Sequence, residues 1–330
     1  MRIATTVPTE VPSESGDLFA RLEQIGYDTG FSFEAKHDPF LPLALASQHT
    51  TNLRLGTAVA IGFARNPMVL ANLGWDLQQM SAGRFVLGLG SQIRPHIENR
   101  FSERWSRPAA RMRELVLAVR SIWHAWDNGS ELSFRGDFYH HTLMIPAFDP
   151  GPNPHGSPPV FIGGFGPRMI EVAGEVADGL IVHPFNTRTS VEEIVLPALA
   201  RGRAQAHRGE DDVEIVWVTM VVTWTTDEEH ETAIRSVKDQ LAFYGSTPAY
   251  APVLDIHGYG ELHVELNRMS KEGRWPEMAE LIPDAFVEAV AVVGPRPEIA
   301  GKIAARMSGI TDSVSVVNNR NPDPRSSPTS

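Results

Sequence analysis

The sequence contains no cysteine, and this absence removes several classes of chemistry. Without thiols the chain can form no disulfide, use no thiolate nucleophile and bind neither a cysteine-ligated zinc nor an iron–sulfur cluster. Basic residues are outnumbered, with 29 Lys and Arg against 40 Asp and Glu and a net charge of −11. Because such a chain is poorly suited to wrapping a nucleic acid backbone, we expect no nucleic acid partner.

Long hydrophobic runs are also missing. No apolar stretch approaches the roughly 18 residues that a membrane-spanning helix needs, so we expect no membrane partner. The first residues, from Met1 to Thr5, have the pattern of a strand rather than of a secretory signal. The sequence therefore predicts a cytoplasmic protein.

Several familiar catalytic signatures are absent as well. The chain has neither a His-Glu-x-x-His zinc signature nor a Gly-x-Ser-x-Gly nucleophile elbow. His140 and His141 are adjacent, so in a strand they point to opposite faces and do not chelate one metal. Gly88 and Gly90 are followed by Ile93 where a dinucleotide fingerprint needs its third glycine. We therefore expect no metal site and no nicotinamide site of the Rossmann type.

What the sequence does have is a regular alternation of short apolar runs with amphipathic stretches. Its 330 residues, 42% hydrophobic and 21% charged, suit a globular enzyme. Eight runs are predicted as strands: residues 2–6, 28–33, 53–61, 84–89, 160–162, 179–182, 214–222 and 313–317. Eight strands separated by helices are the number in a (β/α)8 TIM barrel, which we predict as the fold.

Two stretches break this alternation. Residues 127–158, after the fourth strand, contain a predicted hairpin, with strands at 132–134 and 137–139, and a proline-rich run. Residues 242–288, after the seventh strand, contain further helices rich in His, Tyr and Trp. Insertions next to barrel strands often supply lids and substrate walls. Since no linker flanks either insertion, residues 1–317 are predicted to form a single domain, and residues 318–330 a flexible tail.

The most informative stretch is a glycine-rich turn after the predicted strand 160–162. The turn consists of Gly163, Gly164, Phe165 and Gly166, and Arg168 follows at the start of a short helix. Glycines let backbone N–H groups approach a phosphate, a helix start presents unpaired N–H groups, and arginine adds a fork of donors. The pattern indicates an anion-binding site, although a tight turn without a ligand would use the same glycines.

Ionisable residues follow other predicted strands, at the ends where barrel enzymes place their active sites. His37 and Asp38 come after the second strand, His96 lies beyond the fourth, and His183 ends the sixth. Histidines and carboxylates gathered from several strands can perform general acid–base chemistry, although each alone is more often structural. We predict His37, Asp38 and His183 as the catalytic residues.

Several segments, taken in order, carry a family resemblance. They are Gly26-Tyr27-Asp28, Leu53 to Val59, Ser81 to Gly90, Arg107-Pro108 with Met112 to Glu114, the loop from Gly163 to Arg168, Ala177-Asp178-Gly179, and Val292 to Pro295 with Ile299-Ala300. In this order they resemble the bacterial luciferase-like monooxygenase family, in the branch that uses the deazaflavin coenzyme F420. The matching segments span roughly residues 1–185 and extend towards the C-terminus.

The resemblance implies a role for each segment. A cis peptide bond between Ala58 and Val59 would form a bulge behind the deazaflavin, and the loop 163–168 would hold the cofactor phosphate. Gly90, Ser91 and Gln92 would line the other edge of the ring. His37 and Asp38 match polar positions beside the reactive ring carbon, although relatives often have the order Asp-His.

The expected activity is hydride transfer between F420 and a small organic substrate, with His37 or His183 exchanging a proton. Two alternatives remain open: an FMN-dependent monooxygenase that uses a separate reductase and oxygen, and a non-catalytic flavin-binding barrel. The glycine-rich loop would serve FMN equally well.

The resemblance also implies a homodimer. Relatives commonly dimerise through the helices after the second and third strands. On this sequence the apolar residues of those helices that we expect at the interface are Leu43, Leu45, Val69 and Leu70.

Overall fold

The computed structural model describes residues 1–7 and 10–317, so the tail predicted for residues 318–330 lies outside the described residues. The described chain divides into two compact units. The N-terminal unit comprises residues 2–181 and 198–216. The C-terminal unit comprises Met1 and the segments 182–197 and 217–317.

The strands of the N-terminal unit form a sheet in the order β1-β2-β3-β5-β8-β9. Their bounds are β1 (Arg2–Val7), β2 (Thr29–Ser32), β3 (Arg54–Thr57), β5 (Phe85–Gly90), β8 (Val160–Gly164) and β9 (Gly179–Val182). Neighbours from β1 to β8 pair in parallel, as expected when helices connect consecutive strands. Every residue of β5 is buried, which is typical of a strand covered on both faces.

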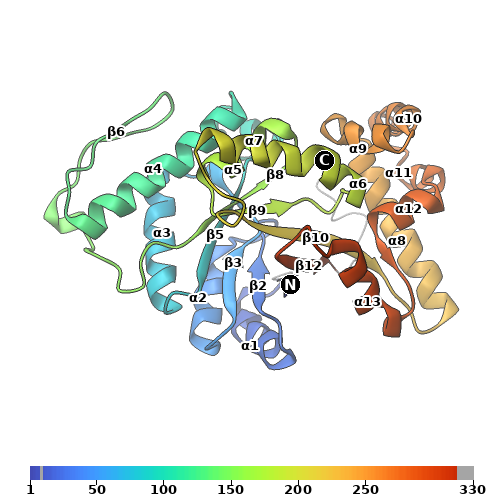
Figure 1. The fold of residues 1–330 in the computed structure, drawn as a ribbon, viewed down its shortest axis with the longest axis horizontal. Coiled ribbons are helices and arrows are strands. Elements are labelled where there is room, and N and C mark those ends of the chain that lie inside the picture. Colours follow the sequence, from blue (N-terminus) through green and yellow to red (C-terminus); the bar gives the residue numbers. More distant parts are fainter. Residues whose placement is uncertain (8–9, 318–330) are drawn as a thin grey trace. The chain divides into compact units, whose positions relative to one another are not determined.

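The helices of this unit pack against one another in chain order, from α1 to α5 (Figure 1). Their bounds are α1 (Ser15–Ile25), α2 (Phe40–His49), α3 (Pro67–Met80), α4 (Pro108–Asn128) and α5 (Pro167–Val176), and α7 (Leu196–Gln205) follows β9. Asn66 caps the start of α3, because its side chain accepts the N–H of Val69 at 3.0 Å and Pro67 is the first helical residue. Trp75, Trp123 and Trp126 pack as buried rings in the α3–α4 contact.

The prediction of one continuous strand over residues 53–61 is wrong. β3 ends at Thr57, and a separate short strand, β4 (Ala60–Ile61), pairs with β5 further along. Between them lies a cis peptide bond joining Ala58 and Val59. The cis bond that the family resemblance implied is therefore confirmed.

The first insertion contains the predicted hairpin, with a shifted second strand. β6 (Phe134–Arg135) and β7 (His140–His141) pair antiparallel, whereas the sequence predicts that the second strand begins at Asp137. Residues 137–139 are held elsewhere, because the Glu114 carboxylate on α4 accepts their three backbone N–H groups at 2.9, 2.7 and 2.7 Å. These N–H groups are thereby unavailable to the strand pair.

Asp178 connects the starts of three strands. Its carboxylate accepts the N–H of Val160 and the guanidinium of Arg120, both at 2.7 Å. Its own N–H donates to the Val160 carbonyl at 2.7 Å, and its carbonyl accepts the N–H of Glu214 at 2.9 Å. The first residues of β8, β9 and β10 (Glu214–Val222) are therefore tied to one side chain and its backbone.

The C-terminal unit is mainly helical. β10 begins in the N-terminal unit and continues into this one, where it pairs in parallel with β11 (Val292–Val293) and lies next to β12 (Ser313–Val317). The helices are α6 (Arg188–Ser190), α8 (Asp227–Gly245), α9 (Ala251–Ile256), α10 (Gly260–Lys271), α11 (Trp275–Met278), α12 (Asp284–Val290) and α13 (Arg296–Met307). The second insertion is thus helical, as predicted. Within residues 1–7 and 10–317, no helix has the length and apolarity needed to span a membrane.

A test of the strand contact is to replace Gly88, on β5, with alanine. An added Cβ would lie 1.8 Å from the backbone oxygen of Thr57, which has no flexible end to move away. We expect Gly88→Ala to lower the free energy of unfolding by about 1–3 kcal/mol or more, measured by urea denaturation. Gly301→Ala is the control, because Gly301 lies in α13 with open space around it and alanine favours a helix by about 0.5–1 kcal/mol. Equal stability of Gly88→Ala and the wild type would contradict the contact.

Candidate functional site

Val59 packs between glycines at the ends of two strands. A Cβ at Gly90 would lie 2.5 Å from Val59 Cγ2, and one at Gly163 would lie 2.6 Å from Val59 Cγ1. The sequence assigns both glycines to cofactor contacts, but in the structure the space left by their missing side chains is occupied by Val59. The structure thus brings together three of the residues predicted for the cofactor site.

Glu34 fastens the segment that carries Val59. Its backbone N–H donates to the Val59 carbonyl at 3.1 Å, and its carboxylate accepts the N–H of Ile61 at 2.7 Å. The side chain is only 7% exposed, and its charge is matched by the Arg65 guanidinium at 2.5 Å. On the other side of the cis bond, the backbone N–H of Ala58 donates to the Ser32 carbonyl at 2.7 Å. The 58–61 segment is therefore held on both sides by β2 and its end.

Asp38 and His37 are adjacent but differ in their surroundings. The Asp38 carboxylate accepts the first two N–H groups of α2 through Oδ1, at 2.8 and 3.3 Å, and the Arg65 guanidinium through Oδ2, at 2.9 Å. His37 is exposed and makes no hydrogen bond or ion pair with the described ranges of the chain. Asp38 thus orders the start of α2, whereas the His37 ring is available to a ligand.

Ser91 and Gln92 make a local turn after β5. The Ser91 hydroxyl donates to the Gln92 carbonyl at 3.0 Å, and the Gln92 side-chain oxygen accepts the N–H of Ile93 at 3.0 Å. Gln92 has a φ of 58°, in the left-handed region. The Gln92 amide nitrogen is the part of this side chain that can still serve a ligand.

The glycine-rich loop after β8 has one packed part and one open part. A Cβ at Gly164 would lie 2.7 Å from Met169 Cγ, so this glycine admits the start of α5. Gly166 has a φ of 89° and open space where a side chain would stand. Arg168 is exposed and makes no hydrogen bond or ion pair with the described part of the chain, and Phe165 is half-buried. The open part combines a helix start with an available cation, which fits a phosphate group.

His183 is the first residue after β9 and belongs to the C-terminal unit. The Tyr250 ring stacks on it with centroids 4.9 Å apart, and the Tyr244 ring meets it edge-on at 4.7 Å. The Nδ1 atom accepts the N–H of Phe185 at 3.1 Å, and the Nε2 atom lies 3.3 Å from the Tyr250 hydroxyl.

These contacts determine the protonation of His183. Burial lowers the pKa of the His183 ring to about 3, so the ring is neutral near pH 7. A neutral imidazole has one proton, and because Nδ1 accepts a hydrogen bond that proton lies on Nε2 and is donated to the Tyr250 oxygen. Since both ring nitrogens are engaged, the geometry supports a donor role for His183 and not the role of a base.

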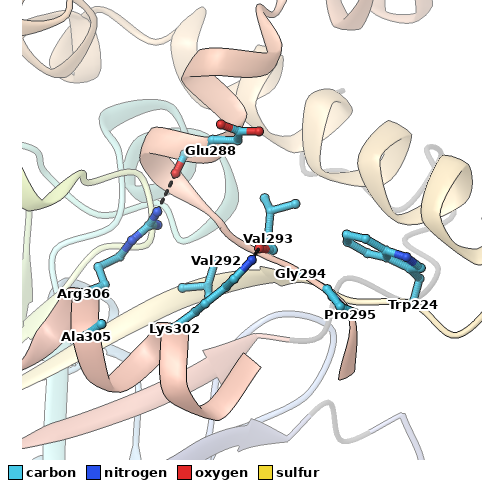
Figure 2. Close-up of a pocket in the computed structure, with 9 residues that line it drawn as sticks. All are labelled: Trp224, Glu288, Val292, Val293, Gly294, Pro295, Lys302, Ala305 and Arg306. Atoms are coloured by element: carbon cyan, nitrogen blue, oxygen red, sulfur yellow. Dashed lines mark hydrogen bonds between the residues drawn. The ribbon is translucent and has the colours of Figure 1, made fainter. Parts of the chain in front are cut away.

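Two cavities are lined by other residues. One of about 600 Å³, in the C-terminal unit, is lined by Trp224, Glu288, Val292, Val293, Gly294, Pro295, Lys302, Ala305 and Arg306 (Figure 2). Arg306 donates to the carbonyls of Val290 and Glu288 in the last turn of α12. Lys302 donates to the Val293 carbonyl, and Figure 2 shows this bond together with the one from Arg306 to Glu288. Both cations therefore stabilise backbone carbonyls.

The other cavity, of about 410 Å³, is in the N-terminal unit and is lined by Ala64, Arg65, Asn66, Val69, Glu103, Arg111, Phe138 and Tyr139. None of the predicted site residues lines either cavity. In residues 1–7 and 10–317, no group of three or more His, Asp or Glu side chains is arranged to hold a metal.

Sequence reasoning missed Arg65 and Tyr250. Arg65 follows the short helical turn of residues 62–64 after β4, and it pairs with Glu34 and Asp38, two carboxylates that come after the second strand of the sequence. Tyr250 had no such signal, because its partner His183 is 67 residues away in the chain.

The buried state of His183 makes stability depend on pH. Its folded pKa is below the ordinary value of 6.5, so between about pH 3 and 6.5 the unfolded chain binds a proton that the folded chain excludes. This stabilisation is complete above pH 6.5 and is lost as the pH falls. We expect the wild type to lose about 2 kcal/mol more unfolding free energy than His183→Gln between pH 7 and pH 5, measured by urea denaturation. Equal losses in the two proteins would show that His183 is protonated in the folded state.

Comparison with known proteins identifies relatives along nearly the whole chain. The family described as luciferase-like monooxygenase matches residues 1–313. An uncharacterized protein of Mycobacterium tuberculosis is 49% identical over 314 residues, which cover 95% of this chain and 92% of that protein. A second protein of the same organism, which carries the provisional name coenzyme F420-dependent oxidoreductase, is 29% identical over 318 residues, covering 91% of this chain and 89% of its own.

A solved structure establishes the fold. The coenzyme F420-dependent tetrahydromethanopterin reductase of Methanopyrus kandleri matches with a TM-score of 0.78 at 19% identity, covering 98% of this chain and 95% of its own. The predicted (β/α)8 barrel is thereby confirmed. This chain belongs to the luciferase-like monooxygenase family.

Proposed function

We propose that this chain is an F420-dependent oxidoreductase that transfers hydride between the deazaflavin and a small organic substrate. The observation that carries the proposal is the open part of the loop after β8. There Gly166 leaves space at the start of α5, and Arg168 has a guanidinium without a partner in the described chain. A phosphate-bearing cofactor fits this arrangement. The relative of Mycobacterium tuberculosis named for F420 supports the deazaflavin as this cofactor.

The proposal assigns roles to the residues around Val59. When bound, F420 would supply the carbon that gives or takes the hydride. Gly166 and Arg168 would hold its phosphate, and the Ala58–Val59 bulge would support its ring. Because Val59 is packed against Gly90 and Gly163, this support has little freedom to move. Ser91 and Gln92 remain proposed contacts at the ring edge.

We assign the exchange of the substrate proton to His37. Its exposed ring has both nitrogens available, and imidazole is the side chain most often used as a general acid or base. Asp38 has both carboxylate oxygens engaged, so its proposed role is to order the chain beside His37. His183 would donate a hydrogen bond rather than accept a proton.

Cofactor binding tests the proposal directly. Titrating the apoprotein with F420 while following tryptophan fluorescence should reveal binding that Arg168→Ala weakens about 10-fold or more, because a hydrogen bond to a charged group contributes about 1.5–3 kcal/mol. Arg21→Ala is the matched control, since Arg21 is also exposed, lies on α1 and has no partner in the described ranges. Equal affinity of the two variants would contradict the assigned phosphate site.

The same titration with FMN separates the alternatives. Tighter binding of FMN than of F420 would favour the monooxygenase that uses a separate reductase and oxygen. Binding of neither cofactor by the folded protein would overturn the proposal. F420 binding without hydride transfer to any substrate would favour a non-catalytic barrel.

We further propose a homodimer formed through α2. Leu43 and Leu70, expected at the interface from the sequence, are wrong candidates because both are fully buried in the core. Leu41 and Leu45 lie one turn apart on α2 and are 64% and 41% exposed, an arrangement that leaves an apolar stripe for a second copy.

Charge on this stripe should separate the subunits. We expect the double variant Leu41→Asp, Leu45→Asp to sediment as a monomer in analytical ultracentrifugation while the wild type sediments as a dimer. Val264→Asp, on α10, introduces the same charge at a residue that is 68% exposed and should remain dimeric. An unchanged sedimentation coefficient in the double variant would locate the interface elsewhere.

A further inference from the structure

The cavity of about 410 Å³ in the N-terminal unit contains a buried arginine that has no hydrogen bond to a carboxylate. Arg111 lies in the first turn of α4 and is 9% exposed. Its guanidinium donates to three neutral oxygens: the Tyr139 hydroxyl at 2.9 Å, the Arg104 carbonyl at 2.6 Å and the Phe63 carbonyl at 3.5 Å. The Glu103 carboxylate is half-exposed and stays 3.8 Å away, beyond hydrogen-bond distance. Because a buried charge is costly without a bonded partner of opposite sign, the cavity favours an anionic ligand.

Two aromatic rings fix the orientation of this guanidinium. Its central carbon lies over the Phe63 ring, 4.7 Å from the centroid, and over the Tyr139 ring, 5.8 Å from the centroid. A guanidinium held in one orientation loses little conformational freedom when it binds a planar anion. Arg111 is therefore already placed for a ligand.

Tyr139 adds a donor that the protein does not use. Its oxygen accepts the Arg111 Nε–H, so the phenolic proton is directed elsewhere, and residues 1–7 and 10–317 supply no acceptor for it. Burial raises the pKa of the Tyr139 phenol, so the hydroxyl keeps its proton at neutral pH.

Asn66 adds a second unused donor at the same cavity. Its side-chain oxygen accepts the N–H of Val69, and its amide nitrogen has no acceptor in the described part of the chain. The donors of Asn66, Tyr139 and Arg111 therefore all suit a ligand that accepts hydrogen bonds.

The other lining residues limit the charge and the shape of the ligand. Arg65 is paired with both Glu34 and Asp38, so it adds no excess positive charge. A ligand with two negative charges, such as a phosphate monoester, would exceed the single charge of Arg111 and would also meet Glu103. The rest of the lining is apolar and consists of Ala64, Val69 and Phe138.

We infer that this cavity binds a small organic monocarboxylate. Its oxygens would accept hydrogen bonds from Arg111, Tyr139 and Asn66, and its hydrocarbon part would lie against the apolar lining. The carboxylate would supply the bonded negative charge that Glu103 does not. The inference goes beyond the proposed function, because none of the residues assigned to F420 lines this cavity.

The first test is isothermal titration calorimetry of the apoprotein at pH 7 with four probes. Cyclohexanecarboxylate should bind, and cyclohexanecarboxamide should bind at least about 10-fold more weakly, because it lacks the charge that strengthens the hydrogen bonds. Cyclohexylammonium and inorganic phosphate should release no heat of binding. Absent binding of the carboxylate would overturn the inference, as would an equal or higher affinity for the carboxamide or for phosphate.

The second test locates the carboxylate at Tyr139. Tyr139→Phe should weaken the binding of cyclohexanecarboxylate about 10-fold, because a hydrogen bond to a charged group contributes an amount of this size. Tyr27→Phe is the matched control and should leave the affinity unchanged, since Tyr27 is also half-buried and its hydroxyl has no hydrogen bond within the described ranges. Equal affinities of the two variants would contradict the assigned site.

The third test uses the exposed side of the cavity, so it holds even if Tyr139→Phe does not fold. Glu103→Gln removes a negative charge beside the site and should raise the affinity for cyclohexanecarboxylate about 3-fold, because a partly exposed charge acts on this scale. Glu131→Gln changes the net charge equally at an exposed residue with no partner in the described chain, and it should have no effect. Equal affinities of these two variants would also count against the site.

These titrations contain no F420. Failure of the carboxylate to bind would therefore leave the proposed function standing, and failure of F420 to bind would leave this inference standing.

Discussion

The packing of Val59 between the ends of β5 and β8 is the constraint on which the rest of the candidate site depends. Gly90 and Gly163 have no side chain because that volume belongs to Val59, and Gly88 has none because the Thr57 oxygen lies against it. Glu34 fastens the same segment through its backbone and its carboxylate. The segment from Thr57 to Ile61 therefore explains why these three positions are glycines and why the Glu34–Arg65 ion pair is buried beside it. The Gly163–Arg168 loop begins at the end of β8, which packs against this segment.

The strands could be predicted from the sequence wherever an apolar run ends at glycine or polar residues. The bounds of β9, β10 and β12 match their predictions, because each is a short buried run between such residues. The break after Thr57 could not be predicted this way, because the apolar pattern of residues 53–61 does not change at the cis bond. Only the family resemblance indicated the break. Glycine is similarly ambiguous: the sequence shows that a side chain is missing but not which neighbour fills the space.

The histidines show how environment divides residues that look alike in a sequence. His37 and His183 both follow predicted strands, and both suit acid–base chemistry by residue type. In the structure one ring is exposed and without a partner in the described chain, while the other lies against two tyrosine rings with both nitrogens engaged. Burial and hydrogen bonding, which are tertiary properties, assign them different chemistry.

Asp178 illustrates a separation of tasks between the two ends of the strands. By tying the first residues of β8, β9 and β10 together, it secures the sheet at the end remote from Gly166. Loops at the carboxyl ends can then change length and composition during evolution without loosening the strands that carry them. Divergence among relatives should accordingly concentrate in the insertions and spare the Ala177-Asp178-Gly179 segment, so that one scaffold can acquire new substrates through its loops alone.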